Sequence, residues 1–224
     1  MNTTRLRERQ LQIGTWLSLG SPVVAELAAD SGFDWLLIDL EHGCGSEAAV
    51  LPQLQAIRGS KTAAIVRVGA PHPDLIARVL DWGADGIMVP HVSTVAEAEA
   101  CVRAAHYPPR GRRGMARTVR ATGYGLRSPD TTQLPLLIAQ IETIEAVENA
   151  RAIASVDGVD VLFVGPADLQ FDLKVRPEVA VRDYASCLRE VATAAGAAGK
   201  LCGLLIRDAA EVGALRELGF THLV

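Results

Sequence analysis

The chain has 224 residues, of which 49% are hydrophobic and 21% charged, and its formal net charge is −4. This balance is typical of a globular protein that is long enough to bury a sizeable core. The negative charge argues against a general nucleic-acid-binding protein, because neutralising phosphates requires a basic surface. No apolar run reaches the length of a membrane span, and the polar amino-terminal segment lacks the apolar stretch of a secretory signal.

The cysteines are widely spaced and form no C-x-x-C pair; they are Cys44, Cys101, Cys187 and Cys202. This spacing favours reduced thiols over a disulfide framework or a zinc site, so we expect a cytoplasmic protein.

Short apolar runs alternate with longer amphipathic stretches along the whole chain. The apolar runs predict eight strands, at Ile13–Leu17, Asp34–Leu40, Ala63–Val68, Gly86–Val89, Leu136–Ile141, Val159–Val164, Leu201–Ile206 and Phe220–Val224. Glycine precedes several of them, as at Gly32, Gly83, Gly158 and Gly219, which is typical of a helix that ends in the left-handed conformation. The runs lack clean alternation of apolar and polar residues, which indicates parallel strands covered on both faces.

Strands alternating with helices predict an α/β fold, and eight strands in this length favour a closed (β/α)8 TIM barrel. An open doubly wound sheet is the alternative, but the turn Leu19-Gly20-Ser21-Pro22 does not match its G-x-G-x-x-G motif. We expect residues 1–224 to form one barrel domain that is incomplete at its carboxyl end. Because the last apolar run reaches Val224, we expect the eighth helix to be missing from these residues.

Polar and charged side chains follow the predicted strands. They are Asp39, Glu41 and His42 after the second, Arg67 in the third, His91 after the fourth, Gln140 and Glu142 in and after the fifth, and Asp168 after the sixth. Catalytic groups of (β/α)8 barrels project from the carboxyl ends of the strands, so we expect these residues to share one mouth. Such a concentration of charge needs partners or a metal ion, because an isolated buried charge is costly.

These strings are similar to the motifs of one enzyme family. The segment Phe33–Gly43, with its Asp39-Leu40-Glu41-His42-Gly43 string, resembles the HpcH/HpaI aldolase family of class II pyruvate aldolases. The same resemblance extends in order to Val66-Arg67-Val68, Gly83–Pro90, Tyr107–Gly111, Gln140-Ile141-Glu142 and Gly165–Leu169. It covers the chain from about Gly14 to the end.

The resemblance implies a barrel of the phosphoenolpyruvate/pyruvate type and a metal-dependent carbon–carbon lyase. The implied reaction is reversible aldol cleavage of a 4-hydroxy-2-oxo acid to pyruvate and an aldehyde through a metal-bound pyruvate enolate. Substrates of the hydroxy-oxo-heptanedioate type and of the keto-deoxy sugar-acid type both remain open.

The resemblance also implies roles for individual residues. Glu142 and Asp168 match the ligands of a divalent metal ion such as Mg²⁺, Mn²⁺ or Co²⁺, and hard divalent ions prefer oxygen ligands of this kind. Arg67 matches the arginine that stabilises the enolate and binds substrate. His42 matches the base, since its pKa lies near neutrality, and Asp81 matches the acid that orients that histidine.

Three further residues are expected to bind substrate, together with Arg67 and Asp168. Gln140 lies on the same strand face as Glu142, Ala167 lies in a turn whose N–H groups face the pyruvate carboxylate, and Trp16 is a pocket wall or a plain core residue. The sequence assigns no role to the other histidines, which are His72, His91, His106 and His222.

Other functions are weighed against this one. A Schiff-base aldolase needs a lysine aimed into the barrel, but Lys61, Lys174 and Lys200 do not lie at the carboxyl ends of strands. A metal-dependent lyase of the phosphoenolpyruvate-mutase or citryl-CoA type, and a non-catalytic barrel that serves as a binding or assembly subunit, are the remaining alternatives. The family resemblance implies a homo-oligomer, either a hexamer or a trimer of dimers. The arginine-rich stretch 110–120 is interpreted as a solvated loop, a subunit contact or a lid over the site.

Overall fold

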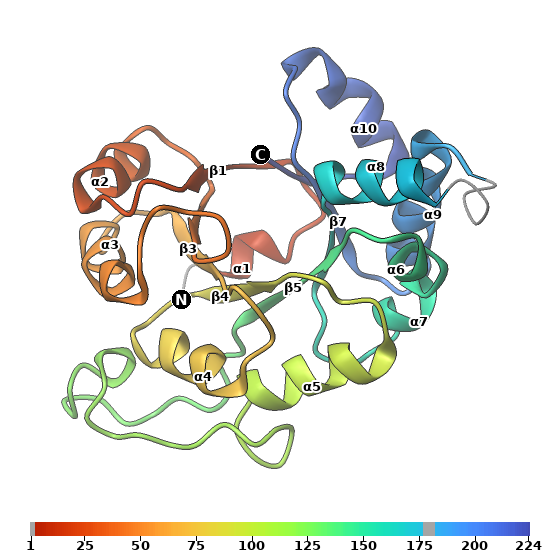
Figure 1. The fold of residues 1–224 in the computed structure, drawn as a ribbon. Helices are drawn as coiled ribbons and strands as arrows, with labels where there is room; N and C mark the ends of the chain where they lie inside the picture. The colour runs from red at the N-terminus through yellow and green to blue at the C-terminus, as the bar shows by residue number, and fades with distance from the viewer. Residues whose placement is uncertain (1–2, 177–181) are drawn as a thin grey trace.

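A closed ring of parallel strands forms the centre of the molecule (Figure 1). The computed structural model describes residues 3–176 and 182–224. The strands are β1 (Gln12–Leu17), β2 (Trp35–Asp39), β3 (Ala63–Arg67), β4 (Gly86–Val89), β5 (Leu136–Ile141), β6 (Val161–Val164), β7 (Leu201–Leu204) and β8 (His222–Leu223).

Each strand pairs in parallel with its neighbours in the sequence, and β8 closes the ring on β1 through Gln12 opposite His222 and Ile13 opposite Leu223. The predicted (β/α)8 barrel is therefore confirmed, and the doubly wound sheet is excluded. All eight predicted strands are present, with ends that differ from the expected ones by at most two residues.

Helices surround the ring and cover its outer face (Figure 1). They are α2 (Pro22–Asp30), α3 (Val50–Ala56), α4 (Pro73–Asp81), α5 (Val95–Ala105), α6 (Ile144–Glu148), α7 (Ala150–Ala154), α8 (Pro166–Val175), α9 (Tyr184–Ala197) and α10 (Val212–Leu218). Thr94 begins α5 with a reciprocal capping box to Glu97, which satisfies two backbone N–H groups at this helix end. No helix among the described residues is long and apolar enough to cross a membrane.

The barrel has an inner and an outer apolar core. The inner core fills the ring with large side chains, including Trp35, Met88 and Phe163, while the outer core lies between strands and helices. Gly14 and Gly203 leave room for the rings of Trp35 and Phe163, because a Cβ at either glycine would overlap the neighbouring ring. The barrel interior is therefore a packed core, and the chemistry is confined to one end of it.

A short amino-terminal helix, α1 (Thr3–Leu6), closes the end of the barrel where the strands begin. Leu6 is buried in the inner core, and its carbonyl oxygen lies 2.9 Å from Nε2 of His222. Burial lowers the pKa of His222 to about 4, so this ring is neutral near pH 7. The opposite end, where the strands finish, is left for the functional site.

The segment 106–135, which contains the arginine-rich stretch 110–120, packs at the same end of the barrel as α1 and not over the mouth. Arg120 donates hydrogen bonds to the carbonyl oxygens of Trp82 and Leu54, at 2.6 and 2.9 Å, and Arg113 pairs with Asp81 at the end of α4. Helices of this barrel end where the next strand begins, so these contacts hold the segment away from the strand carboxyl ends. The interpretation of this segment as a lid over its own chain's site is therefore wrong.

Candidate active site

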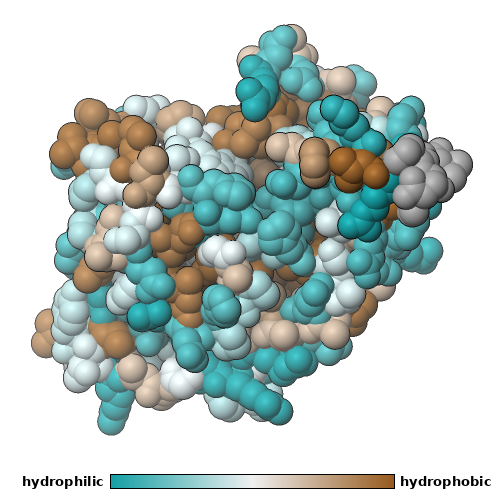
Figure 2. Space-filling model, in the orientation of Figure 1, coloured by the Kyte–Doolittle hydropathy of each residue, from teal (hydrophilic) through white to brown (hydrophobic). Residues whose placement is uncertain are grey.

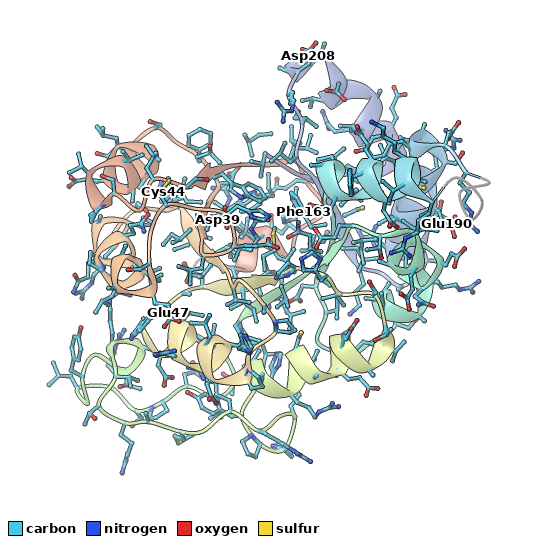
Figure 3. The ribbon with its side chains drawn as sticks, in the orientation of Figure 1. Asp39, Cys44, Glu47, Phe163, Glu190 and Asp208 are labelled. Atoms are coloured by element: carbon cyan, nitrogen blue, oxygen red, sulfur yellow. The ribbon has the colours of Figure 1, made fainter. Side chains whose placement is uncertain are left out.

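The polar side chains at the carboxyl ends of β2, β3 and β5 converge at one mouth of the barrel. Figure 3 shows Asp39 inside the ring of strands, near the labelled Phe163 of the inner core. Asp39 ends β2, Arg67 ends β3, and the buried Glu142 directly follows β5. The register places Asp39 opposite Arg67, so the fold itself brings this acid and base together.

Arg67 is held by two carboxylates. Its Nε and one terminal nitrogen donate to the two oxygens of Asp39 at 2.9 and 2.7 Å, and its other terminal nitrogen lies 2.7 Å from Oε2 of Glu41. All three side chains are at least nine-tenths buried. Burial alone would raise the pKa of Asp39. The hydrogen bonds and charge of Arg67, together with the N–H groups of Glu41 and His42, outweigh burial and lower the pKa below its usual value, so Asp39 stays ionised.

Trp16 forms the wall beside this arginine. The guanidinium carbon of Arg67 lies 5.2 Å from the centre of the Trp16 ring, and that ring packs against Phe163 with 5.8 Å between centroids. The ring is half-buried. It faces the charged site on one side and the inner core on the other, so the two interpretations made from the sequence, pocket wall and core residue, both describe part of its surroundings.

Glu142 is the most deeply buried acid of the site, with 1% of its surface exposed. Nε2 of Gln140 donates to its Oε2 at 2.7 Å, and the backbone N–H of His91 donates to its Oε1 at 2.6 Å. Burial raises the pKa of Glu142, and the nearby charges of Glu41 and Asp168 add to that effect. Oε1 of Gln140 is buried without a hydrogen-bond partner in the described structure, so the site has acceptor capacity that the protein leaves unused.

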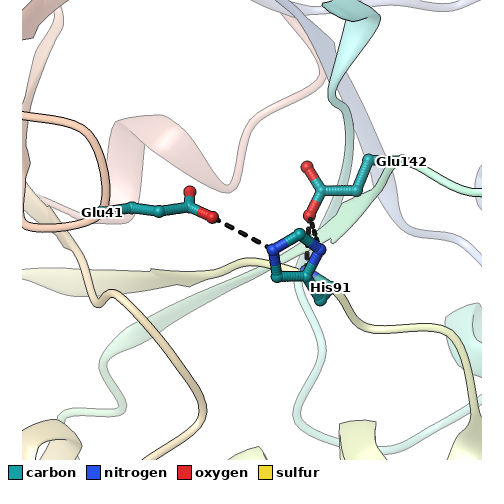
Figure 4. Close-up of side chains that lie close together, drawn as sticks. All are labelled: Glu41, His91 and Glu142. Atoms are coloured by element: carbon teal, nitrogen blue, oxygen red, sulfur yellow. Dashed lines mark hydrogen bonds and ion pairs between the residues drawn. The ribbon is translucent and has the colours of Figure 1, made fainter. Parts of the chain in front are cut away.

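His91 lies between two of these carboxylates (Figure 4). Its Nδ1 is 2.9 Å from Oε1 of Glu142, and its Nε2 is 3.2 Å from Oε1 of Glu41. This residue was expected at the mouth but without an assigned role. It directly follows Pro90 at the end of β4, and the neighbouring strands β3 and β5 carry Arg67 and Glu142, but the contacts of its ring are not visible in the sequence.

The two predicted residues of the β6 turn lie at the start of α8. Ala167 and Asp168 are exposed in the first turn of this helix. Asp168 is close enough to Glu142 for its charge to raise the pKa of that acid. Gly165 begins this turn, and a Cβ on it would lie only 2.6 Å from Oε2 of Glu142. Glycine at this position therefore allows the turn to approach the buried carboxylate.

His42 reaches the mouth from the loop after β2. Its side chain is 68% exposed, and its Nε2 lies 3.9 Å from Oε1 of Glu41. Its backbone N–H donates to Oδ1 of Asp39 at 3.3 Å, which fixes the loop while leaving the ring free toward solvent. An exposed imidazole at the entrance suits a group that exchanges protons with a substrate or with water.

Comparison with known proteins identifies the family. A family model for HpcH/HpaI aldolase/citrate lyase matches residues 12–223. The chain belongs to this family.

Relatives support the same assignment. A 4-hydroxy-2-oxovalerate aldolase of Novosphingobium aromaticivorans is 42% identical over 91% of this chain and 79% of its own length. A 5-keto-4-deoxy-D-glucarate aldolase of Salmonella gallinarum is 37% identical over 97% of this chain and 86% of its own length. A solved HpcH/HpaI aldolase/citrate lyase family protein from Burkholderia cenocepacia J2315 superposes with a TM-score of 0.91 at 36% identity, covering 99% of this chain and 90% of that one. The chain is thus a carbon–carbon lyase of the aldolase type.

Asp81, which the family resemblance implies as the partner of His42, does not lie near His42 in this chain. Asp81 ends α4, at the barrel end where strands begin, whereas His42 lies at the end where they finish. The Asp81 carboxylate instead accepts a hydrogen bond at 2.6 Å from Arg113, whose guanidinium stacks over the Tyr107 ring at 4.6 Å. The orienting role of Asp81 is therefore not formed among the described residues of one chain, because a helix separates the two ends.

A divalent metal ion fits this site on chemical grounds, and HpcH/HpaI enzymes are typically dependent on one. Glu41, His91 and Glu142 each offer one ligand atom, and these atoms lie within 4.8 Å of one another. Two of the three side chains are buried acids whose charges repel, which a bound cation would relieve. Carboxylate and imidazole groups are ordinary ligands of divalent ions.

Proposed function

We propose that this chain catalyses the reversible aldol cleavage of a 4-hydroxy-2-oxo acid to pyruvate and an aldehyde. The observation that carries the proposal is the buried Arg67, held by two carboxylates at the same mouth as the acidic cluster around Glu142. Relatives that are 42% and 37% identical are aldolases of hydroxy-oxo acids by name, which supports the same reaction here.

We propose Glu142 and Asp168 as the protein ligands of the metal ion, with Mg²⁺, Mn²⁺ or Co²⁺ as the candidates. When bound, such an ion acts as a Lewis acid that polarises the 2-oxo group of the substrate. The buried position of Glu142 supports this assignment, because a carboxylate with a raised pKa gains most from a nearby cation. Asp168 is exposed in the first turn of α8.

Arg67 stabilises the charge that develops during cleavage. A guanidinium has five N–H donors, and Arg67 uses two of them in hydrogen bonds to Asp39, while its other terminal nitrogen forms an ion pair with Glu41 and offers the remaining donors for substrate. When the C3–C4 bond breaks, its electron pair forms the enolate of pyruvate and negative charge collects on the former keto oxygen. A fixed cation in a water-poor site stabilises that charge without reorganising.

His42 acts as the base. Cleavage requires loss of the proton on the C4 hydroxyl, and the exposed imidazole accepts it directly or through one water molecule. The C4 oxygen becomes the carbonyl of the aldehyde, and a proton delivered to C3 of the enolate completes pyruvate. Gln140, Ala167 and Trp16 line the mouth and orient the 2-oxo acid, as the resemblance implies.

The chain offers no support for the Schiff-base alternative. Its three lysines lie before β3, within α8 and before β7, all away from the carboxyl ends of the strands. An imine with a 2-oxo acid would need a lysine amine inside the mouth. No observation favours a non-catalytic barrel either, because the His42, Arg67, Glu142 and Asp168 set is complete.

We propose further that the protein works in the cytoplasm as a homo-oligomer, either a hexamer or a trimer of dimers. The four cysteines are free, which suits a reducing compartment. Three apolar side chains at one edge of the barrel are about two-thirds exposed, Leu19, Val23 and Leu27. They lie on and beside α2, where Figure 2 shows an apolar surface in brown, and such a surface is suited to a subunit contact.

A matched pair of substitutions tests the proposed reaction. Glu142→Gln keeps the size of the buried side chain but removes its charge, so pyruvate release from a 4-hydroxy-2-oxo acid should fall below detection. Glu145→Gln makes the same change three residues later at an exposed position and should leave the rate unaltered. Equal rates in the two variants would refute the assignment of Glu142.

A further inference from the structure

His91 is held in a backbone conformation that non-glycine residues rarely adopt. Its φ is 56°, in the left-handed region, directly after β4 and Pro90. Such a conformation is energetically unfavourable for a non-glycine residue and persists only where the surroundings enforce it. Here it allows the backbone N–H and the ring of the same residue both to face Glu142.

Among Glu41, His91 and Glu142, the ring of His91 is the part most exposed to solvent. The His91 side chain is 60% exposed, whereas those of Glu41 and Glu142 are 8% and 1% exposed. Both ring nitrogens nevertheless face carboxylate oxygens, at 2.9 and 3.2 Å. An exposed histidine that turns both nitrogens inward to two buried acids is placed for binding and not for packing.

We propose that His91 is a further protein ligand of the divalent ion, through Nδ1, beside Glu142. This inference rests on the metal site of the proposed function and adds a nitrogen to an otherwise all-oxygen ligand set. Metal–ligand bonds of about 2.1 Å separate neighbouring ligand atoms by about 3 Å. The 2.9 Å between Nδ1 of His91 and Oε1 of Glu142 has that spacing.

The other ring nitrogen supports the same assignment. A metal-bound histidine usually donates its second N–H to a carboxylate, which fixes the tautomer and the ring orientation. Nε2 of His91 lies 3.2 Å from Oε1 of Glu41, and Oε2 of Glu41 is held in turn by Arg67 at 2.7 Å. Glu41 is therefore a positioning residue that connects the enolate-binding arginine to the metal-binding ring.

A nitrogen ligand changes which ion the site prefers. Mg²⁺ favours oxygen ligands, whereas imidazole binds Co²⁺, Ni²⁺ and Zn²⁺ well, and Mn²⁺ accepts both kinds. Loss of the ring should therefore weaken binding of Co²⁺ strongly and of Mg²⁺ little. This selectivity is a property of His91 and is independent of the aldehyde that the enzyme accepts.

The test is a nitrogen coupling in the electron spin-echo spectrum of Mn²⁺ bound to the whole chain. The parent protein should show the coupling of a coordinated imidazole, and His91→Asn should lose it. Asparagine suits the left-handed backbone, so this variant keeps the fold. His42→Ala, which removes the other imidazole near Glu41, and His72→Ala, a helix-start residue elsewhere, should both retain the coupling.

Binding titrations of the same proteins complete the test. In His91→Asn the dissociation constant for Co²⁺ should rise by about tenfold or more, as loss of a ligand or its support does elsewhere, while that for Mg²⁺ changes little. Tight Mn²⁺ binding without nitrogen coupling in the parent protein would overturn the assignment of His91 and leave the proposed aldolase reaction intact. Absence of Mn²⁺ binding would overturn both the ligand and the metal site beneath it.

Discussion

The replacement Arg67→Lys isolates the role of the guanidinium, because it keeps the positive charge and removes the forked set of N–H donors. Three charged contacts of 2.9, 2.7 and 2.7 Å hold this side chain to Asp39 and Glu41. A lysine ammonium is a compact point charge that cannot reproduce the paired bonds to Asp39. At least one charge-assisted hydrogen bond is lost, which costs about 1.5–3 kcal/mol of unfolding free energy.

The effect on catalysis should be larger than the effect on folding. Loss of one fixed donor to a developing oxyanion lowers kcat by about 10²–10³ in other enzymes, and we expect a decrease of that order here. The assay is release of pyruvate from a 4-hydroxy-2-oxo acid at saturating metal, with a urea titration on the same sample to confirm that the variant is folded. Substrate KM should change less than kcat, because the charge develops after binding.

Arg78→Lys is the matched control. Arg78 pairs with Glu47 at 2.9 Å and lies over the Trp82 ring at 5.7 Å, but both members of the ion pair are about half exposed. Both kcat and the urea midpoint should stay unaltered in this variant. A folded Arg67→Lys protein with the kcat of the parent would refute the requirement for a guanidinium at this position, since a positive charge alone would then suffice.

Three further predictions follow from single contacts. His42→Ala should lower kcat by about 10²–10⁴ with a smaller change in KM, measured as pyruvate release, and an unaltered rate would remove His42 as the base. Gly165→Ala should weaken Mn²⁺ binding, because the new Cβ would lie 2.6 Å from Oε2 of Glu142, whereas Gly114→Ala, with no atom within 4 Å, should bind as the parent does. The pKa of His222 is lowered from 6.5 to about 4 by burial, so the unfolded chain binds more protons in this range and stability falls as the pH drops from about 6.5 to about 4. The loss of unfolding free energy approaches about 3 kcal/mol. Urea titrations across this pH range should show a smaller loss in His222→Gln, and an equal loss in both proteins would contradict a buried neutral ring.

The barrel could be predicted from the sequence because most residues of its strands are apolar. Buried parallel strands such as β2 and β5 begin with several large apolar residues in succession, without regular alternation with polar residues. The pairing of β8 with β1 could not be predicted from the apolar pattern of β8 alone, since β8 has only two residues, His222 and Leu223. The number of strands and the length of the chain predicted the closed barrel.

The site could be predicted as far as strand ends determine it. Arg67 and Glu142 were found because a charged residue at the end of an apolar strand must face the mouth. His91 could be placed at the mouth from its position after β4, but no role could be assigned to it, because its contacts with two acids depend on a left-handed backbone that is not visible in the sequence. Asp81 shows the opposite limit, because helix α4 carries it to the other end of the barrel.

The metal requirement is the central claim and can be measured directly. Pyruvate release from a 4-hydroxy-2-oxo acid should disappear when EDTA is added and return when Mn²⁺ or Mg²⁺ is restored in excess. Loss with EDTA and recovery with the ion would support the cluster around Glu142 as the seat of the chemistry. A rate that is the same with and without EDTA would contradict the account.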